Sequence, residues 1–531
     1  MSDQVPATDT PAATLPPNLS RDTFDRLDRL VTHAEARTET RDVEAPFTGN
    51  VVSAVPECAP DDVELAFERA RSAQTDWADR DAEARAAVAK RLHDAVLDNR
   101  EALVDVVQLE SGKSRAHAYE EVLDVAATAR YYGYRAADLL ESERRRGMVP
   151  GLIRAEVHHH PVGVVGIISP WNYPLTLSIS DAIPALLAGN AVVCKPAEQT
   201  PYTALFARHL LRKAGLPEDL FQVVTGEGAS LGPALVEESD YVCFTGSTAT
   251  GREVAAAAGR NLVDCSLELG GKNPLLVLPD ADLDRAVKGA IGACFTNAGQ
   301  LCISVERCYV HESLYEEFTE RFVEATEALT LGPGYDFEHA VGSLVSADQL
   351  EKVQAHVADA RERGATVHCG GQARPDLGPY FYEPTVLTDL PADADAACEE
   401  TFGPVVSVTP VDSTTEAVER ANDSEYGLNA SVWTENEDLG RAVARDIDCG
   451  TVNVNDAYAA SWASIDAPMG GMDDSGVGRR HGPEGLMRFT EAQTVAVQRL
   501  ALGDPVGVGS ALEAKTLSAA LRLWKRIPFL R

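Results

Sequence analysis

The chain lacks several features that would assign it to a specialised class of protein. No apolar run approaches the ~18 residues that a membrane-spanning helix needs. Residues 1–22 lack the apolar core of a secretory signal. Ten cysteines among 531 residues are too few for a disulfide scaffold. These absences favour a cytoplasmic protein with reduced thiols, and the length predicts two or three domains.

Positive charge is also scarce. The chain has 82 Asp and Glu against 47 Lys and Arg, which gives a formal net charge of −35. Such a field repels nucleic acid and anionic membrane surfaces, so we expect no nucleic-acid partner. The acids are scattered over expected helices, a pattern that resembles proteins of salt-rich cytoplasm, where screening weakens self-repulsion. An acidic enzyme without salt adaptation remains the alternative.

Hydrophobic periodicity predicts an α/β fold. Helical spacing covers residues 60–105 and about 119–143. From residue 162, short apolar strands alternate with helices of 10–15 residues, which is typical of βαβ units around a parallel sheet. The alternation pauses at 270–274, and a second α/β series then runs to residue 455. We therefore predict a domain boundary near residue 270.

Three stretches carry candidate catalytic groups. Asn172 in PWN leaves the carboxyl end of an expected strand, where an amide can donate to an oxyanion. Glu268 ends an apolar strand before two glycines, and burial there would raise its pKa into the range of a general base. Cys302 follows GQL, whereas Cys308 lies in an alternating stretch that predicts a buried strand. Taken singly, a turn asparagine and a packing cysteine remain equally good interpretations.

Three further stretches suggest a nucleotide site. Lys195 ends a strand and Glu198 follows it, so the two could bind ribose or phosphate oxygens. Ser247 and Thr248 begin a helix after a strand, where backbone N–H groups can hold phosphate. In ETFGP, a carboxylate and an aromatic ring precede a turn and could hold a ribose and a nicotinamide. A surface ion pair, an ordinary strand–helix link and an acidic loop are the alternatives.

In this order, PWN, KPAE, FTGST, ELGGK, GQLC and ETFGP resemble the NAD(P)-dependent aldehyde dehydrogenase superfamily over residues 45–500. The wording around 171–193 and 468–482 is most similar to its second-type succinate-semialdehyde dehydrogenase branch. The resemblance implies a Rossmann-like cofactor domain, a second α/β catalytic domain and a small β oligomerisation arm. We assign a disordered N-terminal tail (1–42), a cofactor domain (43–146 and 161–269), a catalytic domain (270–470), an arm (147–160 and 487–500) and a basic amphipathic tail (501–531).

The resemblance also implies residue roles. Cys302 matches the nucleophile, Asn172 the oxyanion donor, and Glu268 the base that activates water for thioester hydrolysis. The residues implied to bind NAD(P)⁺ are Trp171, Lys195, Glu198, Ser247, Thr248, Leu269, Glu400 and Phe402. Glu198 favours NAD⁺ because its carboxylate would repel a 2′-phosphate, although the branch is usually labelled NADP⁺. No metal is expected. A non-catalytic relative would be free to lose Cys302 or Glu268, and both are present.

Substrate and partners follow less directly. The branch implies succinate semialdehyde, yet the stretch after PWNYP contains no Arg or Lys to pair with its carboxylate. Arg307, or the 456–466 loop with Tyr458 and Trp462, could line the tunnel instead. A broad-specificity enzyme, or one for medium-chain or aromatic aldehydes, is therefore the alternative. The resemblance implies a homodimer or homotetramer.

Two outlying features remain. Three histidines at 158–160 lie on an alternating stretch, so neighbours point to opposite faces and a metal site is disfavoured. In the tail, Leu517, Leu521 and Trp524 recur at helical spacing among basic residues. Such a helix can contact an anionic membrane surface. The alternative is docking on the acidic surface of the protein itself or of a neighbouring subunit.

Overall fold

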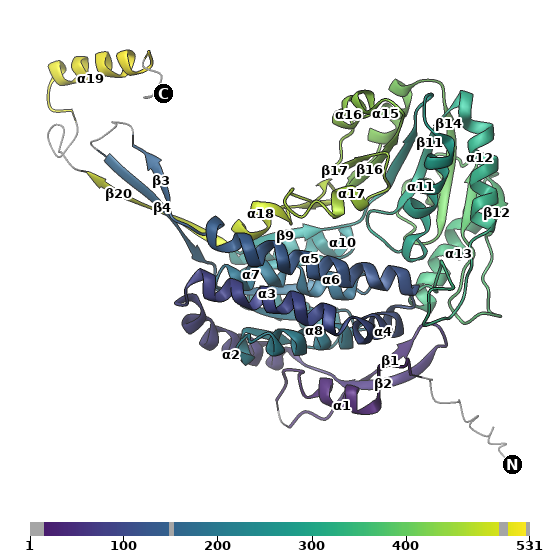
Figure 1. The fold of residues 1–531 in the computed structure, drawn as a ribbon, viewed down its shortest axis with the longest axis horizontal. Coiled ribbons are helices and arrows are strands. Elements are labelled where there is room, and N and C mark those ends of the chain that lie inside the picture. Colours follow the sequence, from purple (N-terminus) through teal and green to yellow (C-terminus); the bar gives the residue numbers. More distant parts are fainter. Residues whose placement is uncertain (1–14, 35, 148–152, 499–507, 527–531) are drawn as a thin grey trace.

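A computed structural model describes residues 15–34, 36–147, 153–498 and 508–526. Two large sheets make up most of the fold, and a small three-stranded sheet projects from the body (Figure 1). The α/β prediction is confirmed, since strands and helices alternate through both large sheets. Within the described residues, no helix combines the length and apolarity needed to cross a bilayer.

The first large sheet is a doubly wound parallel sheet. Its strand order is β19-β9-β8-β5-β6-β7, and every pair is parallel except β9 with β19. Because β6 and β7 lie on one side of β5 and β8 and β9 on the other, the order reverses between β5 and β8. Ligands of such sheets bind at the carboxyl ends of the strands at this reversal. The strands are β5 (Val164–Ser169), β6 (Ala191–Pro196), β7 (Phe221–Val223), β8 (Tyr241–Thr245), β9 (Asp264–Glu268) and β19 (Gly476–Val477).

Helices cover this sheet and bury a continuous apolar core. β5 and β6 are buried along nearly their whole length, as expected of strands covered on both faces. The helices of this half are α2 (Pro60–Ala78), α3 (Ala82–Asp98), α4 (Arg100–Ser111), α5 (Arg115–Leu139), α6 (Pro174–Ile179), α7 (Ala182–Leu187), α8 (Pro201–Lys213), α9 (Gly228–Glu238) and α10 (Thr248–Asn261).

The second large sheet has the order β12-β13-β14-β11-β10-β16-β17 and is parallel except for β12 with β13. The chain enters it directly after β9, across residues 269–272, so the amino ends of β10 and β11 lie near the carboxyl end of β9. Its strands are β10 (Asn273–Val277), β11 (Val305–His311), β12 (Thr366–Cys369), β13 (Thr385–Thr388), β14 (Val405–Val411), β16 (Asn429–Trp433) and β17 (Thr451–Val454). Its helices include α11 (Leu283–Phe295), α12 (Glu312–Glu327), α13 (Ala347–Glu362), α15 (Thr414–Asn422), α16 (Glu437–Arg445) and α17 (Ala459–Trp462).

The projecting sheet joins segments that are far apart in the sequence. It consists of β3 (Glu143–Arg146), β4 (Ile153–Pro161) and β20 (Thr490–Gln498), all antiparallel, with β4 in the centre. After α18 (Gly482–Met487) the chain enters β20, and α19 (Ala511–Trp524) is drawn apart from the body (Figure 1). Several predicted segments lie partly outside the described residues: 1–14 and 35 of the N-terminal tail, 148–152 and 499–500 of the arm, and 501–507 and 527–531 of the C-terminal tail.

The prediction of a disordered tail up to residue 42 is wrong for residues 15–34. α1 (Arg21–Asp28) forms there, and β1 (Thr40–Ala45) pairs with β2 (Asn50–Pro56) soon after. The physical reason is burial: Phe24 and Leu27 are fully buried, and the Phe24 ring packs edge-on against Tyr202 of α8 at 4.8 Å. The remaining domain boundaries, including residue 270, stay predictions.

Replacing Phe24 with Ala tests this docking. Truncation of a buried Phe typically costs about 3–5 kcal/mol of unfolding free energy. We therefore expect a lower thermal melting temperature, whereas Phe337→Ala should change little because Phe337 is exposed. Equal melting temperatures for Phe24→Ala and the wild-type chain would contradict docking of α1 on α8.

Candidate active site

Cys302 is distinguished from the other nine cysteines by its position. Seven of the ten are buried, among them Cys308, whose predicted burial in β11 is confirmed. Cys302 is partly exposed and lies between a short turn and β11, where it packs beside Tyr458 and Trp462. The side-chain amide of Asn273 donates to the Cys302 carbonyl at 2.8 Å, which fixes the backbone at this position.

The surroundings of the Cys302 thiol are anionic rather than electropositive. Burial raises the pKa of Cys302 to about 12, and the carboxylates of Glu268 and Glu400 act in the same direction. Arg480 is the cation that opposes them. Two carboxyl groups thus oppose ionisation of the sulfur. At neutral pH the thiol is protonated in this state.

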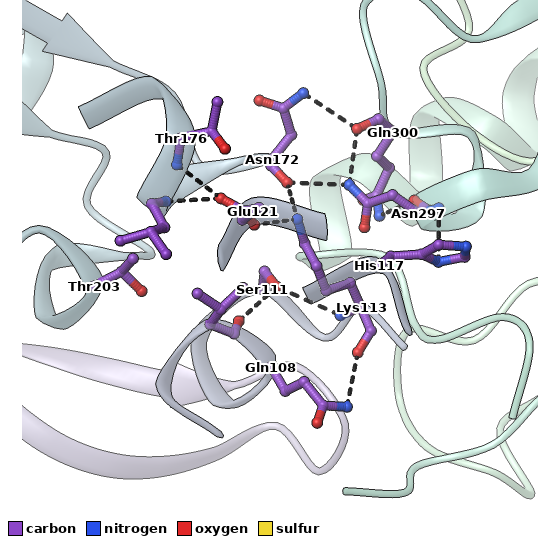
Figure 2. Close-up of polar contacts among 12 residues, drawn as sticks. Gln108, Ser111, Lys113, His117, Glu121, Asn172, Thr176, Thr203, Asn297 and Gln300 are labelled. Carbon is purple, nitrogen blue, oxygen red and sulfur yellow. Dashed lines mark hydrogen bonds and ion pairs between the residues drawn. The ribbon is translucent and has the colours of Figure 1, made fainter. Parts of the chain in front are cut away.

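Asn172 lies next to the Cys302 segment. It follows β5, is buried, and donates from its side-chain amide to the carbonyl of Gln300 at 3.2 Å (Figure 2). The Asn297 side chain bridges the two segments, donating to the carbonyls of Asn172 at 3.1 Å and Gln300 at 2.9 Å. The structure thus brings together two stretches that are 130 residues apart in the sequence.

Glu268 ends β9 at the entrance to the second sheet. Its side chain is buried, and its Oε1 atom has no hydrogen-bond partner among the described residues. Burial raises the pKa of Glu268 to about 7, and the nearest opposing influence is the guanidinium of Arg480. A carboxylate with this pKa can both accept and release a proton near neutrality.

Arg480 belongs to a buried charge cluster that sequence reasoning missed. One carboxylate oxygen of Asp181 faces two guanidinium groups, Arg488 at 2.7 Å and Arg480 at 3.3 Å. Burial opposes its charge, but the two arginines lower the pKa of Asp181. The only sign of this cluster in the sequence is the group of basic residues at 479–480 and 488. Their partner, Asp181, lies about 300 residues away, so the spacing of the basic residues does not reveal it.

Lys195 and Glu198 form a pair beside the first sheet. The Lys195 ammonium contacts Glu198 at 2.8 Å, and the same carboxylate oxygen accepts the backbone N–H of Gly228. Burial works against its charge, but Lys195 and the Gly228 amide lower the pKa of Glu198. This carboxylate therefore stays ionised.

The turn after β8 begins α10. The Ser247 hydroxyl accepts the Thr250 N–H at 3.3 Å and so caps the helix, while the Thr248 hydroxyl donates to the carbonyl of Asp474. Leu269 is buried directly after β9 and packs against α10 at Gly251. This helix start lies at the strand-order reversal, where a phosphate group would meet free backbone N–H groups.

Glu400 lies against the turn at Gly271, and the rings of Phe402 and Trp171 contact each other. Glu400 accepts the Gly271 N–H at 2.9 Å, and the Phe402 and Trp171 rings lie edge to face with centroids 5.5 Å apart. Burial and the nearby Glu306 raise the pKa of Glu400 to about 7. The close fit leaves no space for a side chain at Gly270, because an added Cβ would lie 2.6 Å from Glu400.

Apolar side chains gather beside Cys302. Tyr173, Leu177, Leu301, Ile303 and Met469 form a buried cluster, and Cys302, Tyr458 and Trp462 pack against it. The expected Arg307 does not line it, because its guanidinium is buried and donates to the backbone carbonyls of Lys272, Arg420 and Ala421. Glu120 of α5 is partly exposed and interacts with Tyr458 and Tyr173, and burial raises its pKa to about 7.

The histidines at 158–160 do not converge. On β4, His158 bonds to Ser142 at 2.8 Å and His160 to Gln493 at 3.2 Å, whereas the ring nitrogens of His159 have no described partner. Across the part of the chain that the structure describes, no group of three His, Cys, Asp or Glu side chains could hold a metal ion.

Comparison with known proteins gives consistent matches. The profile described as the aldehyde dehydrogenase family matches residues 33–495. A Mycolicibacterium smegmatis protein named "putative succinate-semialdehyde dehydrogenase", with NADP(+) specified, is 52% identical over 508 residues, or 95% of this chain and 98% of its own.

Solved structures agree with these matches. A Bacillus cereus aldehyde dehydrogenase with NAD+ is 36% identical, with a TM-score of 0.84 over 90% of this chain and 99% of its own. Staphylococcus aureus betaine aldehyde dehydrogenase with NAD+ is 31% identical, with a TM-score of 0.84 over 91% and 98%.

Proposed function

The chain belongs to the aldehyde dehydrogenase family, and from that premise we propose that it oxidises succinate semialdehyde to the free acid with NAD(P)⁺. One observation carries the chemistry: the partly exposed Cys302 lies beside both a buried carboxylate with a pKa of about 7 and the segment that bears Asn172. Nucleophile, base and oxyanion donor are thus gathered at one place.

The residues divide the reaction between them. The Cys302 thiol releases its proton to solvent and its sulfur adds to the aldehyde carbon, while the amide of Asn172 and the backbone N–H of Cys302 donate to the developing oxyanion. Bound NAD(P)⁺ would supply the acceptor for the hydride that the carbon loses as the thioester forms. Ionised Glu268 then removes a proton from a water molecule whose oxygen attacks the thioester carbon, and the C–S bond breaks to release the acid and the Cys302 thiolate. The Oε1 atom of Glu268 has no partner among the described residues and so can take this proton.

The cofactor groups fit a dinucleotide. The nicotinamide ring would lie against Trp171, Leu269 and Phe402. The ribose hydroxyls would find a hydrogen-bond donor in Lys195 and an acceptor in Glu400. A phosphate group would bind at the start of α10, at Ser247 and Thr248. We propose a preference for NAD⁺, because ionised Glu198 would repel a 2′-phosphate by about 4 kcal/mol at ~4 Å and an effective dielectric near 20. Two observations favour NADP⁺ instead. The charge of Lys195 offsets part of that repulsion, and the name of the M. smegmatis relative specifies NADP(+).

The apolar surroundings of Cys302 support a second substrate class. Arg307 is bound to backbone carbonyls elsewhere, the side chains packed around Cys302 are aromatic and aliphatic, and the carboxyl of Glu120 interacts with two of them, Tyr173 and Tyr458. These features favour neutral medium-chain or aromatic aldehydes over a carboxylate. Relatives' names support succinate semialdehyde, so both classes enter the test.

The remaining proposals concern the setting of the enzyme. Val495 and Val497 are exposed on β20, an edge strand of the projecting sheet, which supports a homodimer or homotetramer.

The net charge of −35 supports adaptation of the enzyme to a salt-rich cytoplasm. The exposed leucines of α19, Leu512, Leu521 and Leu523, fit either an anionic membrane surface or a neighbouring subunit.

The function is tested by following NAD(P)H formation in molar KCl with succinate semialdehyde, hexanal and benzaldehyde. We expect Cys302→Ala to abolish it. Glu268→Gln should release about one NAD(P)H per site and then stall, because thioester hydrolysis lacks its base. Steady turnover by Cys302→Ala would refute the mechanism, and the ratio of kcat/KM values decides between the substrate classes.

Glu268 also sets a pH dependence. Because its pKa is about 7, hydrolysis should fall as pH drops below 7. Arg480 lowers this pKa, so Arg480→Gln should move the acid limb of the kcat profile to higher pH. Arg445→Gln, on an exposed helix end, is the control. An unchanged acid limb in Arg480→Gln would show that Arg480 does not act on the base.

Glu198 is expected to set cofactor preference. Glu198→Ser removes the charge that opposes a 2′-phosphate and should raise kcat/KM for NADP⁺ relative to NAD⁺ at least ~10-fold. The ratio should shift most at low salt, where screening is weakest. If the wild-type enzyme already prefers NADP⁺ and the variant leaves the ratio unchanged, the proposed role of Glu198 is wrong.

A further inference from the structure

A fully buried ion pair contacts the Asn172 segment. Lys113 follows α4 and Glu121 lies in α5, with the ammonium 2.5 Å from the carboxylate. Both side chains have 0% exposure. Burial lowers the pKa of Lys113 and raises the pKa of Glu121, so the site opposes both charges. Because desolvation of two charges is costly, a buried ion pair contributes little to the stability of a fold by itself. The role of this pair is therefore sought in the hydrogen bonds that it makes to the neighbouring backbone.

The Lys113 ammonium forms a hydrogen bond to the backbone of Asn172. It donates to the Asn172 carbonyl at 2.6 Å (Figure 2). It also lies over the Tyr173 ring, 3.8 Å from the centroid. With Glu121 as its third contact, each of its three N–H groups has a partner. No other ammonium or guanidinium among the described residues is recorded on that carbonyl.

The Glu121 carboxylate holds the chain just beyond Asn172. Its second oxygen accepts the backbone N–H groups of Leu175 at 2.8 Å and Thr176 at 3.1 Å, at the start of α6. These N–H groups have no partner within the helix, so a charged acceptor satisfies them well. The pair therefore fixes the link between β5 and α6 at two points, one on Asn172 and one after it.

The held carbonyl also belongs to the contacts that join Asn172 to the Cys302 segment. Asn297 donates to it and to the Gln300 carbonyl, and the Asn172 amide donates to the same Gln300 oxygen. Lys113 and Asn297 thus bind the Asn172 carbonyl from two directions. Without the Lys113 ammonium, the Asn172 carbonyl would keep only its hydrogen bond from Asn297. The peptide group of Asn172 could then rotate, and its side-chain amide would turn away from Cys302.

We infer that Lys113 and Glu121 are positioning residues for the oxyanion donor: they hold the Asn172 backbone so that its side-chain amide is aimed at the oxygen formed when Cys302 attacks. The inference rests on the proposed function. Donors of this kind act only when held in place, and displacement of about 1 Å can cost ~10²-fold in rate. Both residues act through Asn172 and need not touch the substrate.

The test measures the pre-steady-state burst of NAD(P)H, which reports the steps before thioester hydrolysis. Asn172→Ala should slow the burst by about 10²–10³-fold. The double variant K113M/E121Q removes both buried charges together and should slow it by ~10–10²-fold. In the Asn172→Ala background the same double change should slow it by less than about threefold, since residues that act through one group are not additive.

Three further variants and readouts separate positioning from a general loss of structure. Lys113→Gln keeps an N–H donor for the Asn172 carbonyl and should retain more burst rate than Lys113→Met. The buried pair Arg115–Asp105, at 2.7 Å, does not contact Asn172, so R115M/D105N should lower the melting temperature and leave the burst rate within about twofold. Alkylation of Cys302 by iodoacetamide involves no oxyanion and should proceed at the wild-type rate in K113M/E121Q.

The inference is overturned if the losses from K113M/E121Q and Asn172→Ala multiply, if the Arg115–Asp105 change slows the burst equally, or if alkylation falls in parallel with the burst. These outcomes differ from failure of the proposed function. That failure would appear as an unaffected burst in Asn172→Ala or in Cys302→Ala, before any Lys113 variant is considered.

Discussion

Desolvation of charge is the constraint on which this structure depends. Where the first large sheet joins the second, the carboxyl group of Glu268 is buried, and Glu400 and Cys302 are only partly exposed. Burial disfavours every charged form, so each group must either find a partner or shift its pKa toward neutrality. Among the described residues neither Glu268 nor Glu400 has an ion-pair partner, and their pKa values rise to about 7. In this way burial turns ordinary carboxylates into groups that titrate at working pH.

Paired charges in the same region hold backbone instead. Lys113 and Glu121 bind the Asn172 segment, and Lys272 with Glu306 binds the loop that carries Glu400. The division has a physical reason. A group that must exchange protons cannot be locked in an ion pair, whereas one that must stay fixed gains from several charged hydrogen bonds. The free and the paired carboxylates therefore serve different ends in one low-dielectric region.

Sequence patterns predicted the fold class and the places of the strands that carry the site, because parallel strands read as apolar runs regardless of their partners. Cys302, Asn172 and Glu268 could be proposed from motifs. Lys113, Glu121 and Arg480 could not, since their significance lies in contacts across 54 to 299 positions of sequence. The N-terminal segment was misread for the same reason: its apolar residues are sparse, and only the surface of α8 shows what they bury against.

The anionic surroundings of Cys302 carry one further consequence. Burial and the two neighbouring carboxyl groups raise the pKa of Cys302 and so favour the thiol, which is the less nucleophilic form. Activation must accompany binding, when a positively charged nicotinamide would approach between Glu400, Phe402 and the sulfur. Its charge would offset the two carboxylates that raise the pKa of Cys302, and the pKa would fall. Reactivity of the nucleophile would then be coupled to the presence of the oxidant.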